Sequence, residues 1–276
     1  MNGKPIDIIV VGQGAAGLAA ALSAAEEARA RDLPVAVSLI DKASADEAGG
    51  NTRWTPAYMR MAAPDRVEPS FVHDMLEATR FQGDESYFAR LAHDVPATVA
   101  WIAAHGVEFH QPTYYLAKGP PRIQPVGGGA PIFRQLTRVA QEAGVLFRHA
   151  CAAEGLVAAY NAACTGDPAR FDPTRCEGLS AGGPLVPPKS NWARAISEPP
   201  FLAWPLVGGV AYTFGGLATD DRARVLRGGA PIPGLYAAGE ITGHFYATAP
   251  NAVSVLRAFV FGRIAGREAV ASALRR

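Results

Sequence analysis

The sequence predicts an α/β fold with a parallel, Rossmann-like sheet, and two observations carry this prediction. Near the start of the chain, the apolar run 8–11 leads into the glycine-rich segment 12–17, and an alanine-rich helical pattern follows over residues 18–30. Near the end, the glycine-containing segment 234–240 precedes a second long helical pattern. A strand, a glycine turn and a helix in this order are typical of a unit that binds a dinucleotide.

The first glycine turn has the sequence context that dinucleotide binding requires. Gly12, Gly14 and Gly17 have the GxGxxG spacing, which lets the backbone approach a pyrophosphate at a helix N-terminus. The next expected strand, Val35–Ile40, is followed by Asp41, where an acid commonly binds ribose hydroxyls. A glycine turn without any ligand is the alternative interpretation.

The remaining patterns predict further helices and short strands. Helix-spaced apolar residues run from 67 to 106, and a second helix over 131–143 follows a run of three glycines. The last helix is expected over 251–274 and a short one over 154–164. Strand-like patterns occur at 107–109, 145–147, 201–217, 223–226 and 231–237.

Composition excludes several classes of function. In 276 residues, an apolar fraction of 49% supports a sizeable core, and a net charge of +1 gives no electrostatic reason to bind nucleic acid. No apolar run reaches the roughly 20 residues of a membrane-spanning helix, so no integral membrane segment is expected. Cys151, Cys164 and Cys176 lack CxxC spacing, which argues against a metal site or a disulfide framework and for a reducing, cytoplasmic location.

Taken together, the chain resembles the flavoproteins related to the flavin subunits of fumarate reductase and succinate dehydrogenase. It looks most like the tricarballylate dehydrogenase type. The resemblance covers two blocks, residues 5–150 and 154–274, and implies a Rossmann-like FAD-binding domain with a helical insertion. The segments that carry it occur in family order: 7–17, 49–52, 127–143, 160–163, 187–193, 213–217, 234–240 and 261–266.

The resemblance also implies which residues bind FAD. In the family, the diphosphate lies over the first glycine turn, and the adenosine ribose meets the acid that follows the second strand. The last helix begins beneath the flavin, where a helix N-terminus favours negative charge on the reduced ring. The matching residues here are Gly12, Gly14, Ala15, Ala16, Gly17, Asp41, Lys42, Gly50, Asn51, Thr52, Glu240, Ser254, Val255 and Leu256.

The sequence departs from the family pattern at residues 150–154. Relatives continue there into further strands of the flavin domain and most of a capping domain, which holds the arginine that moves the substrate proton. Here the chain passes directly to a stretch that resembles the tail of that cap. We therefore expect a first FAD-binding block at 1–150, only a remnant of the capping domain at 151–200 and a second FAD-binding block at 201–276. A sheet that lacks strands should also expose apolar edges.

The resemblance implies an FAD-dependent oxidoreductase that acts on a CH–CH bond of a small carboxylic acid and uses an unidentified electron acceptor. His244 is a candidate to hydrogen-bond a substrate carboxylate or a flavin carbonyl. Arg257 and Arg53 are candidates to clamp a carboxylate, because guanidinium groups bind carboxylates bidentately.

Two other hypotheses remain open. The chain could be a shortened, non-catalytic flavin-binding relative. It could also be an NAD-dependent dehydrogenase, which would use the glycine turn and Asp41 but would leave the segments 50–52 and 234–240 without a role.

Overall fold

The computed structural model describes residues 6–112, 120–149, 162–167, 169, 178–181, 214–246, 248 and 250–273. The chain divides into two compact units, one formed by Met1–His149 with Val210–Arg276 and the other by Ala150–Gly209. In the second unit, the described strands β7 (Cys164–Thr165) and β8 (Ser180–Ala181) pair antiparallel. The interpretation of residues 151–200 as a capping-domain remnant stays a prediction.

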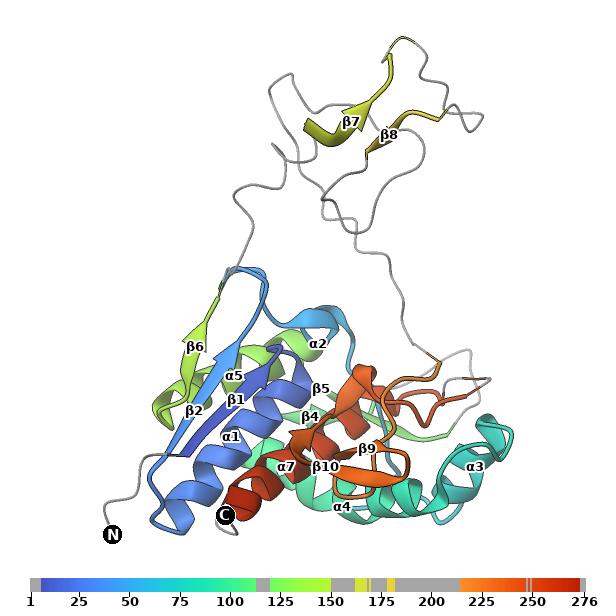
Figure 1. Cartoon of the computed structure of the whole chain (residues 1–276). Coiled ribbons are helices and arrows are strands. Elements are labelled where there is room, and N and C mark those ends of the chain that lie inside the picture. The colour runs from blue at the N-terminus through green and yellow to red at the C-terminus, as the bar shows by residue number, and fades with distance from the viewer. Residues whose placement is uncertain are drawn as a thin grey trace. The chain divides into compact units, whose positions relative to one another are not determined.

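The first unit contains a three-stranded parallel sheet. Its order is β1 (Ile6–Val11), β2 (Val35–Ile40) and β6 (Leu146–Arg148) (Figure 1). Helix α1 (Ala15–Ala30) connects β1 to β2, as the glycine turn predicts. The α/β fold class is therefore confirmed.

The two ends of the chain meet where α1 packs against the last helix, α7 (Ser254–Ala273). A Cβ atom added at Gly262 would lie 2.4 Å from the carbonyl oxygen of Ala16, and one at Gly266 would lie 2.2 Å from that of Ala20. Only glycine allows the two backbones to approach so closely. This contact brings the first and second sequence blocks into one unit.

A helical insertion covers the middle of the first block. It contains α3 (Phe71–Ala78) and α4 (Glu85–Ala104), where the sequence predicts helical structure over 67–106. Arg80 and Phe81 adopt positive φ angles of 52° and 56°, which ends the first helix. The Asp84 carboxylate then caps α4 by accepting the backbone N–H groups of Ser86 and Tyr87.

Short elements complete the first unit. Strands β3 (Met59–Arg60), β5 (Arg122–Pro125) and β4 (Phe109–His110) form a small antiparallel sheet. Helices α2 (Gly50–Trp54) and α5 (Gly129–Glu142) pack together, and β9 (Arg224–Arg227) pairs with β10 (Ala230–Tyr236). Most of the expected helix at 154–164 and most of the strand-like pattern at 201–217 lie outside the described residues, although Cys164 itself belongs to β7.

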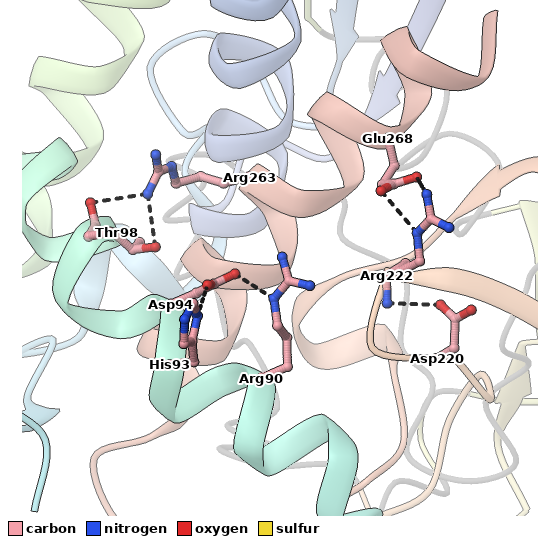
Figure 2. Close-up of polar contacts among 9 residues, drawn as sticks. Arg90, His93, Asp94, Thr98, Asp220, Arg222, Arg263 and Glu268 are labelled. Carbon is pink, nitrogen blue, oxygen red and sulfur yellow. Dashed lines mark hydrogen bonds and ion pairs between the residues drawn. The ribbon is translucent and has the colours of Figure 1, made fainter. Parts of the chain in front are cut away.

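Polar contacts anchor α7 at two points along its length (Figure 2). Arg263 donates to the carbonyl oxygen of Ala97 at 3.2 Å and to the hydroxyl of Thr98 at 3.0 Å, both on α4. Glu268 accepts two hydrogen bonds, of 3.0 Å and 2.6 Å, from the guanidinium of Arg222. These contacts fix α7 between α4 and the segment that leads into β9. Among the described residues, no helix combines the length and apolar character needed to cross a bilayer.

Candidate functional site

The turn after β1 is built tightly against the start of α1. Gly12 has a φ of +96°, and its N–H donates to the carbonyl oxygen of Ile40 at 2.8 Å. A Cβ atom at Gly17 would lie 1.8 Å from the carbonyl oxygen of Gly12. Gly12 therefore adopts a backbone conformation that favours glycine. Gly17 has to lack a side chain, because the carbonyl of Gly12 occupies the place of its Cβ atom.

Asp41 closes this turn from the end of β2. Its Oδ2 accepts the N–H of Gln13 at 2.6 Å, and its Oδ1 accepts the N–H of Ala43 at 2.8 Å. Each carboxylate oxygen can accept a second hydrogen bond, so the group keeps capacity for a ribose hydroxyl. Lys42, beside it, is exposed.

Helix α2 lies against the N-terminus of α1. The buried hydroxyl of Thr52 accepts the N–H of Ala15 at 2.9 Å. A Cβ atom at Gly14 would lie 3.7 Å from that same hydroxyl oxygen, whereas Gly50 and Asn51 are exposed beside it. Residues 50–52, which the sequence analysis takes as part of a loop, begin helix α2, and the structure brings them together with the residues of the first turn.

The second glycine motif reaches the same place from the other end of the chain. Gly239 begins the short 3-10 helix η2 (Gly239–Ile241) with a φ of +81°. A Cβ atom on it would lie 3.0 Å from Cβ of Ala16 and 3.7 Å from Cβ of Ala258, so the motif sits between α1 and α7. Glu240 follows directly, with a side chain that is 36% exposed. In the first turn of α7, Ser254 and Val255 are partly exposed and Leu256 is buried.

These residues fit a dinucleotide cofactor. Among the described residues, the backbone N–H groups of Ala16 and Gly17 have no acceptor, because they belong to the first turn of α1. Unpaired amides at a helix N-terminus bind phosphate groups, and the helix dipole favours the negative charge. Asp41 would then meet the ribose of the cofactor at the end of β2. Glu240 would face the cofactor from the second glycine motif.

Arg257 fixes the loop that follows the second glycine motif. Its side chain is fully buried, and Nη1 donates to the carbonyl oxygens of Gly243 at 2.9 Å and Thr242 at 3.4 Å. Its Nη2 lies 3.2 Å from Oε2 of Glu240, and the guanidinium stacks 3.9 Å from the ring centroid of Phe245. The arginine therefore orients Glu240 and the loop behind it.

His244 lies in the same loop, in an aromatic stack. His244 is 6% exposed and has a φ of +75°, and its Nε2 lies 2.9 Å from the hydroxyl oxygen of Thr219. The imidazole stacks on Tyr87 with centroids 3.8 Å apart, and Tyr87 stacks on Phe261 at 3.9 Å. Burial lowers the pKa of His244 to about 4 and raises that of Tyr87 to about 12, so both rings are neutral near pH 7.

Arg53 holds the loop that precedes α2. Its Nη1 donates to the carbonyl oxygens of Asp46 and Ala48, and its guanidinium lies 5.1 Å from the ring centroid of Trp54. Arg53, Arg257 and His244 thus all contact their own chain. Their proposed roles toward a substrate stay predictions.

The sequence analysis did not single out two residues that shape the site. Gln13 is 1% exposed, donates to Thr137 at 3.1 Å and lies 2.6 Å from Nε2 of His149. A long polar side chain between two glycines of the turn was a usable signal for this role. Tyr87 had no such signal, because its stacking partners come from distant parts of the chain.

The fold and the site define a dinucleotide-binding α/β protein. The family model described as "FAD binding domain" matches residues 7–183 and 132–253. The chain belongs to this FAD-binding family, and FAD is its cofactor, as the sequence predicts.

Several curated proteins match shorter stretches of the chain. It is 41% identical over 83 residues to the NADH:acrylate oxidoreductase of Vibrio harveyi, a match that covers 29% of this chain and 8% of that protein. It is 39% identical over 85 residues to the fumarate reductase (cytochrome) of Shewanella frigidimarina, covering 29% of this chain and 14% of that protein. It is 50% identical over 66 residues to the urocanate reductase of Eggerthella lenta, covering 23% and 11%. The matches therefore span a small part of these relatives' length.

Solved structures share the fold over almost the whole chain. The open conformation of a flavocytochrome c3 fumarate reductase aligns with a TM-score of 0.66 and 16% identity, covering 99% of this chain and 79% of that one. The 3-ketosteroid-Δ4-(5α)-dehydrogenase of Rhodococcus jostii RHA1 aligns with a TM-score of 0.63 and 16% identity, covering 98% of both chains. At this identity, the similarity establishes the fold.

Proposed function

We propose that the protein is an FAD-dependent oxidoreductase that acts on a CH–CH bond of a small carboxylic acid. The observation that carries this proposal is the meeting of both glycine-rich segments at the N-terminus of α1, in a chain of the FAD-binding family. Three relatives are named for acrylate, fumarate and urocanate, which are all unsaturated carboxylates. Their shared chemistry supports the substrate class.

The proposed reaction divides its parts between cofactor and protein. Oxidation of a CH–CH bond to an alkene removes one hydride and one proton: bound FAD would accept the hydride, and a base has to accept the proton. The residues of the first turn would hold the diphosphate and Asp41 the ribose. Glu240, held by Arg257, would contact the ribityl or diphosphate region. A separate acceptor then has to take the electrons.

For the finer assignment, we propose a tricarballylate dehydrogenase-like activity in a cytoplasmic protein, organised as FAD-binding blocks at 1–150 and 201–276 around a cap remnant at 151–200. His244 would hydrogen-bond a substrate carboxylate or a flavin carbonyl. Arg53 and Arg257 would clamp carboxylates. Each of these roles requires the side chain to exchange a contact with its own chain for one with the ligand.

Turnover measurements test the proposal. Purified protein, supplied with FAD, should reduce an artificial electron acceptor when tricarballylate is added, and omission of tricarballylate should abolish the signal. Fumarate with a reduced dye tests the opposite direction with a second small carboxylate. Absence of turnover in both assays, with FAD bound, would reject the enzymatic proposal.

A non-catalytic flavin-binding role is the second candidate. The observation that favours it is the engagement of Arg53, Arg257 and His244 with their own chain. Bound FAD without turnover of any small carboxylate is the result that this role predicts. Family membership favours either flavin-based role over the NAD-dependent alternative.

A further inference from the structure

The small antiparallel sheet of the first unit has one apolar and one polar face. The apolar face is turned to the core, because Met59 of β3 and Ile123 of β5 are fully buried. Successive side chains of a strand point to opposite faces of a sheet, so the next residue on β3 and the preceding one on β5 lie on the other face. They are Arg60 and Arg122, which stand directly opposite each other on the two strands.

The polar face continues onto β4 with two more side chains that form hydrogen bonds. Gln124 follows Arg122 by two positions on β5, and the residue opposite it on β4 is His110. Gln124 is half-buried and His110 is exposed. The face therefore groups two guanidinium groups, an amide and an imidazole, and none of the residues in the three strands is acidic.

The two arginines are placed as they would be around an anion. Like charges directly opposite each other on antiparallel strands are unfavourable, and an anion between them removes the repulsion. Arg60 binds the carboxylate of Asp74 on α3 through Nη2, and its side chain is only 12% exposed. Within the part of the chain that the structure describes, the buried Nε of Arg60 has no hydrogen-bond acceptor. A buried donor without an acceptor is costly, and an oxyanion on this face would supply one.

The polar face borders the start of the last helix. The N–H of Arg60 donates to the carbonyl oxygen of Ala252 at 2.9 Å, two residues before Ser254 begins α7. Under the proposed function, the first turn of α7 lies beneath the flavin. The backbone of Arg60 is thus fixed beside the place where a substrate would meet the cofactor.

We propose that Arg60 and Arg122 bind the carboxylates of a di- or tricarboxylic acid substrate, with Gln124 as an additional hydrogen-bond donor. The identity of the ligand rests on the proposed function. Guanidinium groups form charge-assisted, bidentate pairs with carboxylates, and two of them on one face suit a ligand that carries more than one carboxylate. This pair adds a carboxylate site to the candidates Arg53 and Arg257, whose donors already hold loops of their own chain.

Calorimetric titration of the FAD-loaded full chain with tricarballylate tests this site without reference to turnover. We expect saturable binding that weakens as the salt concentration rises, and no binding of the uncharged trimethyl ester. Arg122→Gln should weaken tricarballylate binding roughly tenfold or more.

Gln124→Glu is a second test, because it places a carboxylate on the same face two residues from Arg122. The new charge should repel tricarballylate and weaken its binding at least as much as Arg122→Gln does. It should also raise the unfolding temperature of the protein, since a carboxylate beside two opposed cations offsets their repulsion. Loss of binding together with a gain in stability separates a ligand site from a merely structural role.

Arg90→Gln is the control, because Arg90 is also a partly exposed arginine but pairs with Asp94 on α4, outside this face. It should bind tricarballylate as the wild type does, and all three variants should keep the wild-type affinity for FAD. Unchanged binding in Arg122→Gln or Gln124→Glu, an equal loss in Arg90→Gln, or no binding by the wild type would overturn the inference. Tricarballylate binding at this face without turnover would contradict the proposed function alone, whereas turnover with an unchanged KM in Arg122→Gln would contradict the site alone.

Discussion

At the scale of single residues, the site depends on side chains that hold the loop around Glu240. Arg257 is the central one, because its guanidinium reaches two carbonyl oxygens, one carboxylate and one aromatic ring. A buried cation needs partners for its donors, and these contacts engage both Nη1 and Nη2 of the guanidinium. Arg257 and the loop around Glu240 therefore hold each other in place.

Replacing Arg257 by methionine should destabilise the protein by about 3 kcal/mol, because two buried carbonyl groups and Glu240 lose their donor. Chemical unfolding in urea measures this change without reference to activity. Arg222→Met is the control, since the Arg222 side chain is 40% exposed in its pair with Glu268 and the loss should stay below about 1 kcal/mol. Similar losses in the two variants would contradict the assigned role.

The lowered pKa of His244 should make the free energy of unfolding depend on pH. Its pKa falls from an ordinary value of 6.5 to about 4, chiefly because the ring is buried. Below pH 6.5 the unfolded chain binds a proton at this ring that the folded chain binds only near pH 4. Stability should therefore fall as the pH drops through this interval, by up to about 3 kcal/mol in total.

The variant His244→Asn measures this contribution, because asparagine tolerates the positive φ at this position better than most residues. Unfolding free energies between pH 7 and pH 4 should decrease less in the variant than in the wild type. His93→Asn, at an exposed side chain, serves as control and should keep the wild-type decrease. Parallel curves for wild type and His244→Asn would refute the prediction.

At the scale of elements, the contact between α1 and α7 joins the two halves of the site. Helix interiors usually gain stability when glycine is replaced by alanine. Gly262 and Gly266 should behave in the opposite way, since a Cβ atom there would meet backbone carbonyl oxygens of α1 at 2.4 Å and 2.2 Å. The small residues thus determine how closely the first and last helices approach.

The variant Gly262→Ala should lower the free energy of unfolding by roughly 1–3 kcal/mol, the usual range for overpacking. It should also weaken FAD binding, because Gly239 lies between the same two helices. Arg267→Ala, on the exposed face of α7, should change stability by less than about 0.5 kcal/mol. A gain in stability for Gly262→Ala, measured by thermal unfolding, would exclude the close contact.

Elements with a strong local pattern were predictable from the sequence. The strand Val35–Ile40 has the predicted bounds, and the last helix ends within a residue of its predicted end. The helical pattern at 67–106 is confirmed as two helices, α3 and α4, and the positive φ angles of Arg80 and Phe81 lie in the break between them. Within the candidate site, the glycine turn and Asp41 follow from spacing, whereas the stack of Tyr87 on His244 arises from long-range packing.

At the scale of the whole molecule, cofactor binding should couple the two ends of the chain. FAD contacts residues from both blocks under this account, so it binds the folded state in preference to the unfolded one. At a free concentration one hundred times its Kd, such a ligand stabilises a protein by about 2.7 kcal/mol. Thermal unfolding with and without excess FAD should show this increase. Adenosine alone, which would reach only the Asp41 end, should give a smaller shift, and an equal shift would argue against a shared site.

A flavin-binding titration tests the central claim most directly, namely that both glycine-rich segments form one FAD site. Quenching of FAD fluorescence on addition of the protein should give saturable binding, with a yellow complex of one FAD per chain. Asp41→Ala at one end and Glu240→Gln at the other should each weaken binding. No uptake of FAD by the folded wild type, or undiminished affinity in the Glu240→Gln variant together with a loss in Asp41→Ala, would contradict a site built from both ends of the chain.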